Sequence, residues 1–234
     1  MKKIVLISLI ITIFCACDKT EQELVINPFL PEHTTAVDEA INLLSIGIAK
    51  AMQYPEFRQF IRTETNKQFD YDYDVLYRFI ADKTLIIEGL GEITVSKLIL
   101  DQLDSEIKKT KLVDREYFEQ LGNKIPNLNI LVPMQYKDWD PINYRPEVVA
   151  CGKDYTESDT EVNVCDYQGN LKKRNIADSD WSQPIVVIQL SERVDENGNL
   201  LVNAGSVMLS EESRCITADE AYEFATDDLK SGIN

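Results

Sequence analysis

Residues 125–133, IPNLNILVP, mark the point at which the hydrophobic pattern of the chain changes its period. Beyond Asn127 the apolar residues stand in short, β-branched-rich runs between clusters of Pro, Gly, Asn and Asp, which is typical of strands. Turn signals at 168–170 and 195–199 indicate hairpins. Thr217 and Glu220 form a capping box that begins a final helix. The expected strands are 128–132, 148–151, 162–167 and 184–190.

Upstream of this stretch the apolar spacing is helical. From Val37 to Met52 apolar residues recur at three- and four-residue intervals, and Thr34 or Thr35 is placed to cap the helix start. Pro55 suits the first turn of a second helix. Further helical stripes are expected at 75–80, 95–107 and 113–121. Because helices precede strands instead of alternating with them, we expect an α+β fold: an N-terminal helical bundle, a mainly antiparallel β-sheet region and a C-terminal helix.

The beginning of the chain has the pattern of an export signal. Two lysines at 2–3 precede an apolar stretch at 4–14 that is too short to span a bilayer core of roughly 30 Å. Residues 14–17, FCAC, resemble a bacterial lipobox, which implies that Cys17 is lipidated with palmitate-like chains. The alternatives are a simple hydrophobic anchor and a secreted, unlipidated product. The expected organisation is a signal peptide at 1–16, a tether at 17–33, a helical region at 34–126, and a β-rich region with a C-terminal helix at 127–234.

The charge of the chain limits its partners. Without residues 1–16 it has 22 basic and 40 acidic side chains, a formal charge of −18. Nucleic acids and anionic lipid headgroups are bound by clustered Lys and Arg, so we do not expect nucleic acid as a partner. The expected partners are the membrane, through the lipid anchor, and an envelope protein or glycan.

Three cysteines remain after Cys15 and Cys17, namely Cys151, Cys165 and Cys215. In an oxidising compartment, Cys151 and Cys165 could close a disulfide across adjacent strands. The equally supported alternative is that all three cysteines are isolated, buried thiols, because the spacing of the cysteines matches no disulfide framework.

No catalytic residue, metal ligand or cofactor is predicted. The one histidine, His33, lies in the expected tether, which excludes a multi-histidine metal site. Asp70, Asp72 and Asp74 imitate the first ligands of a calcium loop, but the glycine and the bidentate glutamate that such a loop needs are absent downstream. We interpret these three residues as a solvated acidic turn before a helix.

Each of the two tryptophans is flanked by carboxylates. Trp139 lies between Asp138 and Asp140, and Trp181 follows Asp178 and Asp180. An aromatic ring beside acids can stack on a sugar whose hydroxyls donate to the carboxylates, so Trp139, Trp181, Asp140 and Asp180 are the candidate ligand contacts. Alternatively, both rings pack onto the strands that follow.

Three segments, FRQFIRTETNKQFDYDYDVLY at 57–77, IPNLNILVP at 125–133 and PIVVIQLSERVDENGNL at 184–200, resemble those of uncharacterised Bacteroidota-type lipoproteins. The resemblance implies an outer-membrane lipoprotein and carries no known activity. We therefore expect a lipid-anchored, non-enzymatic binding or interaction module, facing either the periplasm or the cell exterior. The alternatives are a secreted hydrolase directed at carbohydrate and the N-terminal accessory part of a larger envelope enzyme.

Overall fold

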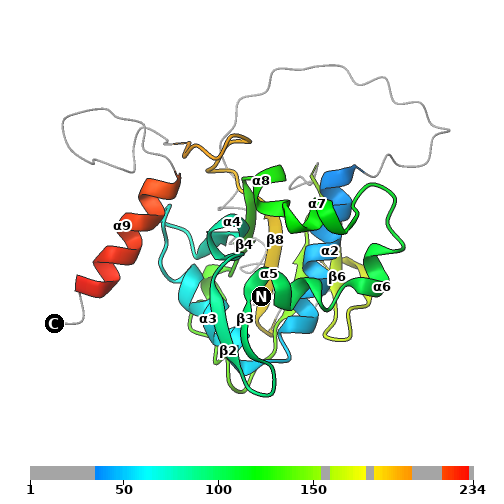
Figure 1. The fold of residues 1–234 in the computed structure, drawn as a ribbon, viewed down its shortest axis with the longest axis horizontal. Helices are drawn as coiled ribbons and strands as arrows, with labels where there is room; N and C mark the ends of the chain where they lie inside the picture. Colours follow the sequence, from blue (N-terminus) through cyan, green and yellow to red (C-terminus); the bar gives the residue numbers. More distant parts are fainter. Residues whose placement is uncertain (1–34, 154–158, 178–181, 202–217, 232–234) are drawn as a thin grey trace.

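The computed structural model describes residues 35–153, 159–177, 182–201 and 218–231 (Figure 1). None of the helices in these ranges is long and apolar enough to cross a membrane. In chain order the elements are α2 (Ala36–Ala51), α3 (Pro55–Thr65), β1 (Asp74–Leu76), α4 (Tyr77–Ile80), β2 (Thr84–Ile87), β3 (Gly91–Thr94), α5 (Val95–Leu100), α6 (Asp104–Ile107), α7 (Arg115–Glu119), α8 (Leu121–Lys124), β4 (Leu128–Leu131), the 3₁₀ turn η1 (Met134–Tyr136), β5 (Glu147–Ala150), β6 (Glu161–Cys165), β7 (Leu171–Asn175), β8 (Ile185–Leu190) and α9 (Ala218–Ser231).

A six-stranded mixed sheet is the centre of the fold, with the strand order β1-β4-β8-β5-β6-β7. Its neighbouring strands pair antiparallel, with the exception of β5 and β8, which run parallel and in register from Glu147 opposite Ile185 to Ala150 opposite Ile188. β2 and β3 form a separate two-stranded antiparallel sheet.

The expected division into a helical bundle followed by a sheet is wrong, because the fold is mixed α/β. β1 lies within the predicted helical region, yet it pairs with β4 as a strand of the main sheet. All three of its residues are buried, so it shows no alternation of apolar and polar side chains, and the apolar spacing at 75–80 predicts a helix instead. The β2–β3 hairpin was also missed, although positive φ angles at Gly89 and Gly91 mark its turn.

Other local predictions are confirmed. Thr35 caps α2 in a capping box with Asp38, whose backbone N–H donates to the Thr35 hydroxyl over 3.1 Å. Pro55 is the first residue of α3. The strands expected from the β-branched runs are β4, β5, β6 and β8. The stripe expected as one helix at 95–107 instead forms two short helices, α5 and α6.

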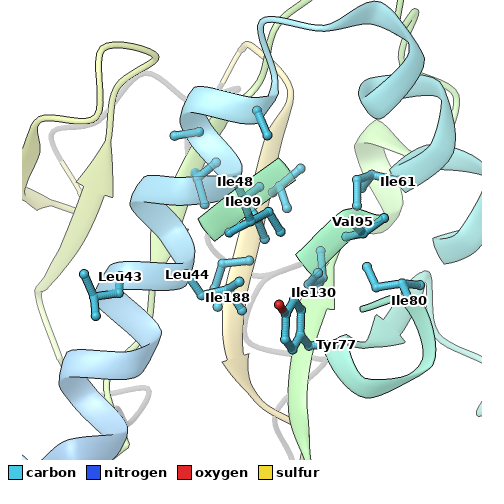
Figure 2. Close-up of a cluster of buried hydrophobic side chains, with 14 of the residues drawn as sticks. Leu43, Leu44, Ile48, Ile61, Tyr77, Ile80, Val95, Ile99, Ile130 and Ile188 are labelled. Carbon is cyan, nitrogen blue, oxygen red and sulfur yellow. The ribbon is translucent and has the colours of Figure 1, made fainter. Parts of the chain in front are cut away.

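One hydrophobic core joins the two halves of the chain. α2 packs across β5, β6 and β8, and its buried side chains meet those of α5 and the sheet in a single cluster (Figure 2). Because strand side chains alternate between the two faces of a sheet, the opposite face carries a second, smaller cluster. That cluster consists of Val149, Cys151, Val162, Val164 and Val187, with Leu131, Ile176 and Ile185 packed against it. The predicted regions 34–126 and 127–234 thus share the main core.

Candidate functional site

The parallel pairing of β5 with β8 brings three segments together at one end of the sheet. Both strands begin at this end, and β4, which is antiparallel to β8, finishes there. The loop at 132–146 and the residues just before β8 therefore meet. Between them lies a pocket of about 400 Å³, lined by Gln135, Tyr136, Asp138, Trp139, Asp140, Tyr144, Ser182, Gln183 and Pro184.

Local hydrogen bonds shape the loop at 132–146. After η1, the backbone N–H of Trp139 donates to the Tyr136 carbonyl over 2.8 Å, and that of Tyr144 donates to the Asp140 carbonyl over 3.0 Å. The Asp140 carboxylate accepts from the backbone N–H of Ile142 at 2.8 Å and from the side chain of Asn143. These bonds fold the loop back on itself, so that its aromatic residues face one pocket.

Arg58 of α3 anchors this loop to the helical layer. Its guanidinium is buried, and it donates to the carbonyls of Met52, at 2.7 Å, and Gln53 at the end of α2. It also donates to the carbonyls of Pro141 and, at 3.0 Å, Ile142 in the loop. A cation is favourable at a helix C-terminus, and a guanidinium can satisfy several carbonyls at once. Arg58 therefore holds the loop through backbone carbonyls, and none of these hydrogen bonds goes to a carboxylate.

The three aromatic residues of the pocket differ in exposure. Trp139 is 6% exposed and Tyr136 is 9% exposed, whereas Tyr144 is 49% exposed. The indole Nε1 of Trp139 is buried and has no hydrogen-bond partner. Trp139 thus belongs to the floor of the pocket, and Tyr144 offers the accessible ring face.

The structure brings together some of the residues that the sequence predicts to contact a ligand. Asp138, Trp139 and Asp140 all line the pocket. Trp181, Asp178 and Asp180 lie outside the described residues, as does Cys17, but residues 182–184, which follow Trp181 directly, line the same pocket. Sequence reasoning missed Tyr136, Tyr144 and Gln183. The closely spaced aromatic residues of YKDWDPINY at 136–144 were the signal that could have identified the two tyrosines.

Asp70 and Asp74 are buried, so the interpretation of a solvated acidic turn is wrong. Both are 3% exposed, and Asp74 accepts from the Asn129 side chain over 2.6 Å. Asp70 Oδ2 and Asp74 Oδ1 are buried and have no hydrogen-bond partner. Burial raises the pKa of both, and for Asp74 the charge of Asp70 adds to the effect. The raised pKa values favour the protonated form of these carboxyl groups.

Of the two alternatives for Cys151 and Cys165, the structure has buried free thiols and no disulfide between them. Cys165 packs in the main core and Cys151 in the cluster on the other face of the sheet. Side chains on opposite faces cannot reach the geometry of a disulfide. Burial raises the pKa of each thiol to about 12, which makes both poor nucleophiles at neutral pH. Cys215 lies outside the described residues.

Within the part of the chain that the structure describes, no group of three or more His, Cys, Asp or Glu side chains is arranged to hold a metal ion. Comparison of the chain with protein-family models, with curated proteins and with solved structures gave no match. The pocket and the buried acid pair therefore have to be interpreted from their own chemistry.

We expect Arg58→Met to lower the free energy of unfolding by about 2–4 kcal/mol, because it leaves buried carbonyls without donors. Hydrogen–deuterium exchange should speed up in the loop at 132–146. Gln59→Met is the control on the same helix, because Gln59 is exposed and its side chain donates to Thr63 of α3, and it should change stability by less than about 1 kcal/mol. If this loop exchanged hydrogen for deuterium at the same rate in both variants, the anchoring role of Arg58 would be contradicted.

The acid pair predicts a pH dependence of stability. Because the folded-state pKa values are raised, the contribution of the pair is fully present below about pH 4 and is lost as the pH rises through those pKa values. Asp74→Asn can still donate to Asp70 and accept from Asn129. Chemical denaturation between pH 4 and 8 should show wild type losing stability relative to this variant, with a slope of up to about 1.4 kcal/mol per pH unit. Parallel curves would contradict the raised pKa of the buried acids.

Proposed function

We propose that the protein is a lipid-anchored, non-enzymatic binding module of the bacterial cell envelope, and that its pocket takes a neutral glycan. The observation that carries the proposal is the convergence of an exposed tyrosine ring, a tryptophan floor and two carboxylates in one pocket. A volume of about 400 Å³ lies within the range of small-molecule sites. It is large enough for one or two sugar rings.

The polar groups of the pocket support an uncharged ligand rich in hydroxyls. Its described lining residues include the acids Asp138 and Asp140 and no basic side chain, which disfavours an anion. Gln135 and Gln183 add amide donors and acceptors at the rim. Sugar hydroxyls can donate to the carboxylates while the apolar face of the ring stacks on Tyr144.

Asp140 is better suited to binding a glycan than to acting as the acid in glycoside hydrolysis. Glycoside hydrolysis needs a carboxylic acid whose pKa is raised, so that it can protonate the leaving group. In this pocket the hydrogen bond from the Asn143 side chain, together with backbone donors, holds the pKa of Asp140 below its ordinary value. Asp140 is therefore ionised at neutral pH and is already engaged in shaping the loop. It is suited to accept a hydrogen bond and not to deliver a proton.

The anchor is the second part of the proposal and rests on residues 14–17. Two or more acyl chains, at about 0.8 kcal/mol per buried methylene, hold a protein stably on a membrane, whereas one chain alone does not. The strong negative charge of the chain would keep its body away from anionic headgroups, so that the pocket stays open to solvent.

Isothermal titration calorimetry with a panel of neutral oligosaccharides tests the pocket. We expect Tyr144→Ala to weaken the affinity of any glycan that binds about three- to tenfold, because the stacking face is lost. Tyr71→Ala is the matched control, since Tyr71 is 57% exposed and does not line the pocket. A panel without binding, or an affinity that Tyr144→Ala leaves unchanged, would refute the glycan site.

Mass spectrometry and membrane fractionation test the anchor. Wild type should carry diacylglycerol on Cys17 and should sediment with membranes. Cys17→Ala should lose both properties, while the control Cys15→Ala should keep them, because Cys15 lies in the segment that is removed. A wild-type protein that is soluble and unmodified would refute the anchor and leave the pocket proposal standing.

A further inference from the structure

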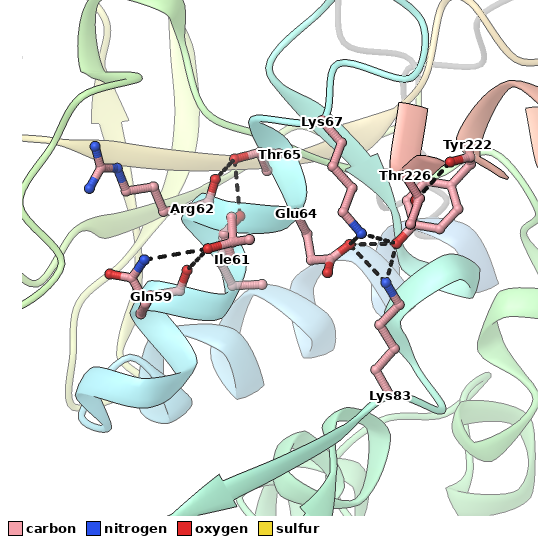
Figure 3. A network of polar contacts seen from close by, with 10 residues as sticks. Gln59, Ile61, Arg62, Glu64, Thr65, Lys67, Lys83, Tyr222 and Thr226 are labelled. Carbon is pink, nitrogen blue, oxygen red and sulfur yellow. Dashed lines mark hydrogen bonds and ion pairs between the residues drawn. The ribbon is translucent and has the colours of Figure 1, made fainter. Parts of the chain in front are cut away.

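Tyr222 of α9 is inserted into a groove formed by α3, α4 and the residues that follow them (Figure 3). Its ring stacks on Phe79 of α4 with centroids 4.4 Å apart and meets Phe69 edge-on at 6.5 Å. Phe69 and Phe79 are themselves in edge-to-face contact at 5.5 Å. The ring is thus held on two sides by aromatic surfaces.

The Tyr222 hydroxyl is the centre of a charged network. It donates to Glu64 Oε2 and accepts from Lys83 Nζ and, at 3.1 Å, from Lys67 Nζ. Glu64 Oε2 also pairs with Lys67 at 2.7 Å and with Lys83 at 2.9 Å. Both ammonium groups lie 4.8 Å from the ring centroid, within the range of cation–π attraction. We call Glu64, Lys67, Phe69, Phe79 and Lys83 the tyrosine groove.

The groove is selective for a tyrosine. A phenylalanine would occupy the same aromatic space, but it would leave the two ammonium groups and the carboxylate without the hydroxyl that they share. Hydrogen bonds to charged partners are stronger than neutral ones, so this loss weighs heavily. Burial and the hydrogen bond to Glu64 raise the pKa of Tyr222, which therefore stays protonated and able to donate.

Four described side chains of α9 pack against the rest of the protein. Ala218, Ala221 and Ala225 join Tyr222 in the small cluster around Phe69, at helical spacing. At the first turn of the helix, Arg78 Nη2 pairs with Asp219 Oδ2 at 2.9 Å. The helix is acidic, with the sequence ADEAYEFATDDLKS, and the surface that receives it supplies Lys67, Arg78 and Lys83. Charge complementarity thus adds to the recognition of the tyrosine.

The length of chain between α9 and the sheet permits a second arrangement. Residues 202–217 join Leu201 to Ala218, and a segment of this length can span up to about 50 Å when extended. The same helix could therefore reach its own groove or that of a neighbouring molecule. In Figure 1, α9 is the outermost helix, on the side opposite α6.

We propose that the tyrosine groove is a docking site for an acidic, tyrosine-bearing helix, filled in this structure by α9 of the same chain, and that α9 of a second copy occupies it in an exchanged dimer. Both arrangements make the same contacts, so their balance depends on concentration. The inference is independent of the glycan pocket, which uses other residues.

Two full-length variants with complementary defects test the exchange. Tyr222→Ala has an intact groove and a defective helix, whereas Lys67→Glu/Lys83→Glu has an intact helix and a defective groove. Circular dichroism and thermal unfolding first establish that each variant is folded. In size-exclusion chromatography with light scattering, each variant alone should be monomeric, and their mixture should form a dimer. A mixture that stays monomeric at the highest soluble concentration would overturn the exchange.

A labelled peptide tests the recognition itself. The peptide ADEAYEFATDDLKS, residues 218–231, should bind the Tyr222→Ala protein in fluorescence anisotropy. The same peptide with phenylalanine in place of its tyrosine is the matched control and should bind at least about tenfold more weakly, because it lacks the hydroxyl. Equal affinities, or no binding of the tyrosine peptide to a folded Tyr222→Ala protein, would overturn the docking site.

Discussion

The parallel pairing of β5 with β8 determines where the loops of this protein meet. In an otherwise antiparallel sheet, it places the beginnings of two strands and the end of β4 at the same edge. The loop at 132–146 and the residues before β8 must therefore lie together, although some forty residues separate them in the sequence. If β5 and β8 were antiparallel, β5 would begin at the opposite end of the sheet, and the later part of that loop, with Tyr144, would lead away from the residues before β8. The candidate site is thus a consequence of strand direction.

α3 connects the two functional proposals. Near its first turn Arg58 holds the pocket loop through backbone carbonyls, and near its last turn Glu64 holds Tyr222 of α9. Both side chains are buried charges, and each is satisfied by several partners. Removing a partner from a buried charge costs much more than a surface contact contributes. The position of this one helix therefore governs both the shape of the pocket and the docking of the C-terminal helix.

Much of the local structure could be predicted from the sequence, whereas the way in which the elements pack together in the fold could not. The runs that form β4, β5, β6 and β8 and the capping box of α2 are recognisable, because β-branched runs between turn residues and capping residues are local signals. β1 is not, since a fully buried three-residue strand has no period. Trp139 and its flanking acids are recognisable in the sequence, and the aromatic spacing of 136–144 hints at Tyr144, but the fold is needed to bring the residues before β8 to the same pocket. Asp70 and Asp74 were taken for surface groups because carboxylates are seldom buried without a partner.

Nuclear Overhauser effects between the β5 and β8 backbones test the central claim most directly, because their pattern distinguishes parallel from antiparallel strands. We predict cross-strand contacts that pair Val148 with Val186, Val149 with Val187 and Ala150 with Ile188, in the amide-to-α pattern of parallel strands. Strong α-to-α contacts in a reversed register, with Val148 near Ile188 and Ala150 near Val186, would contradict the parallel pairing. The pocket as described here would then not exist.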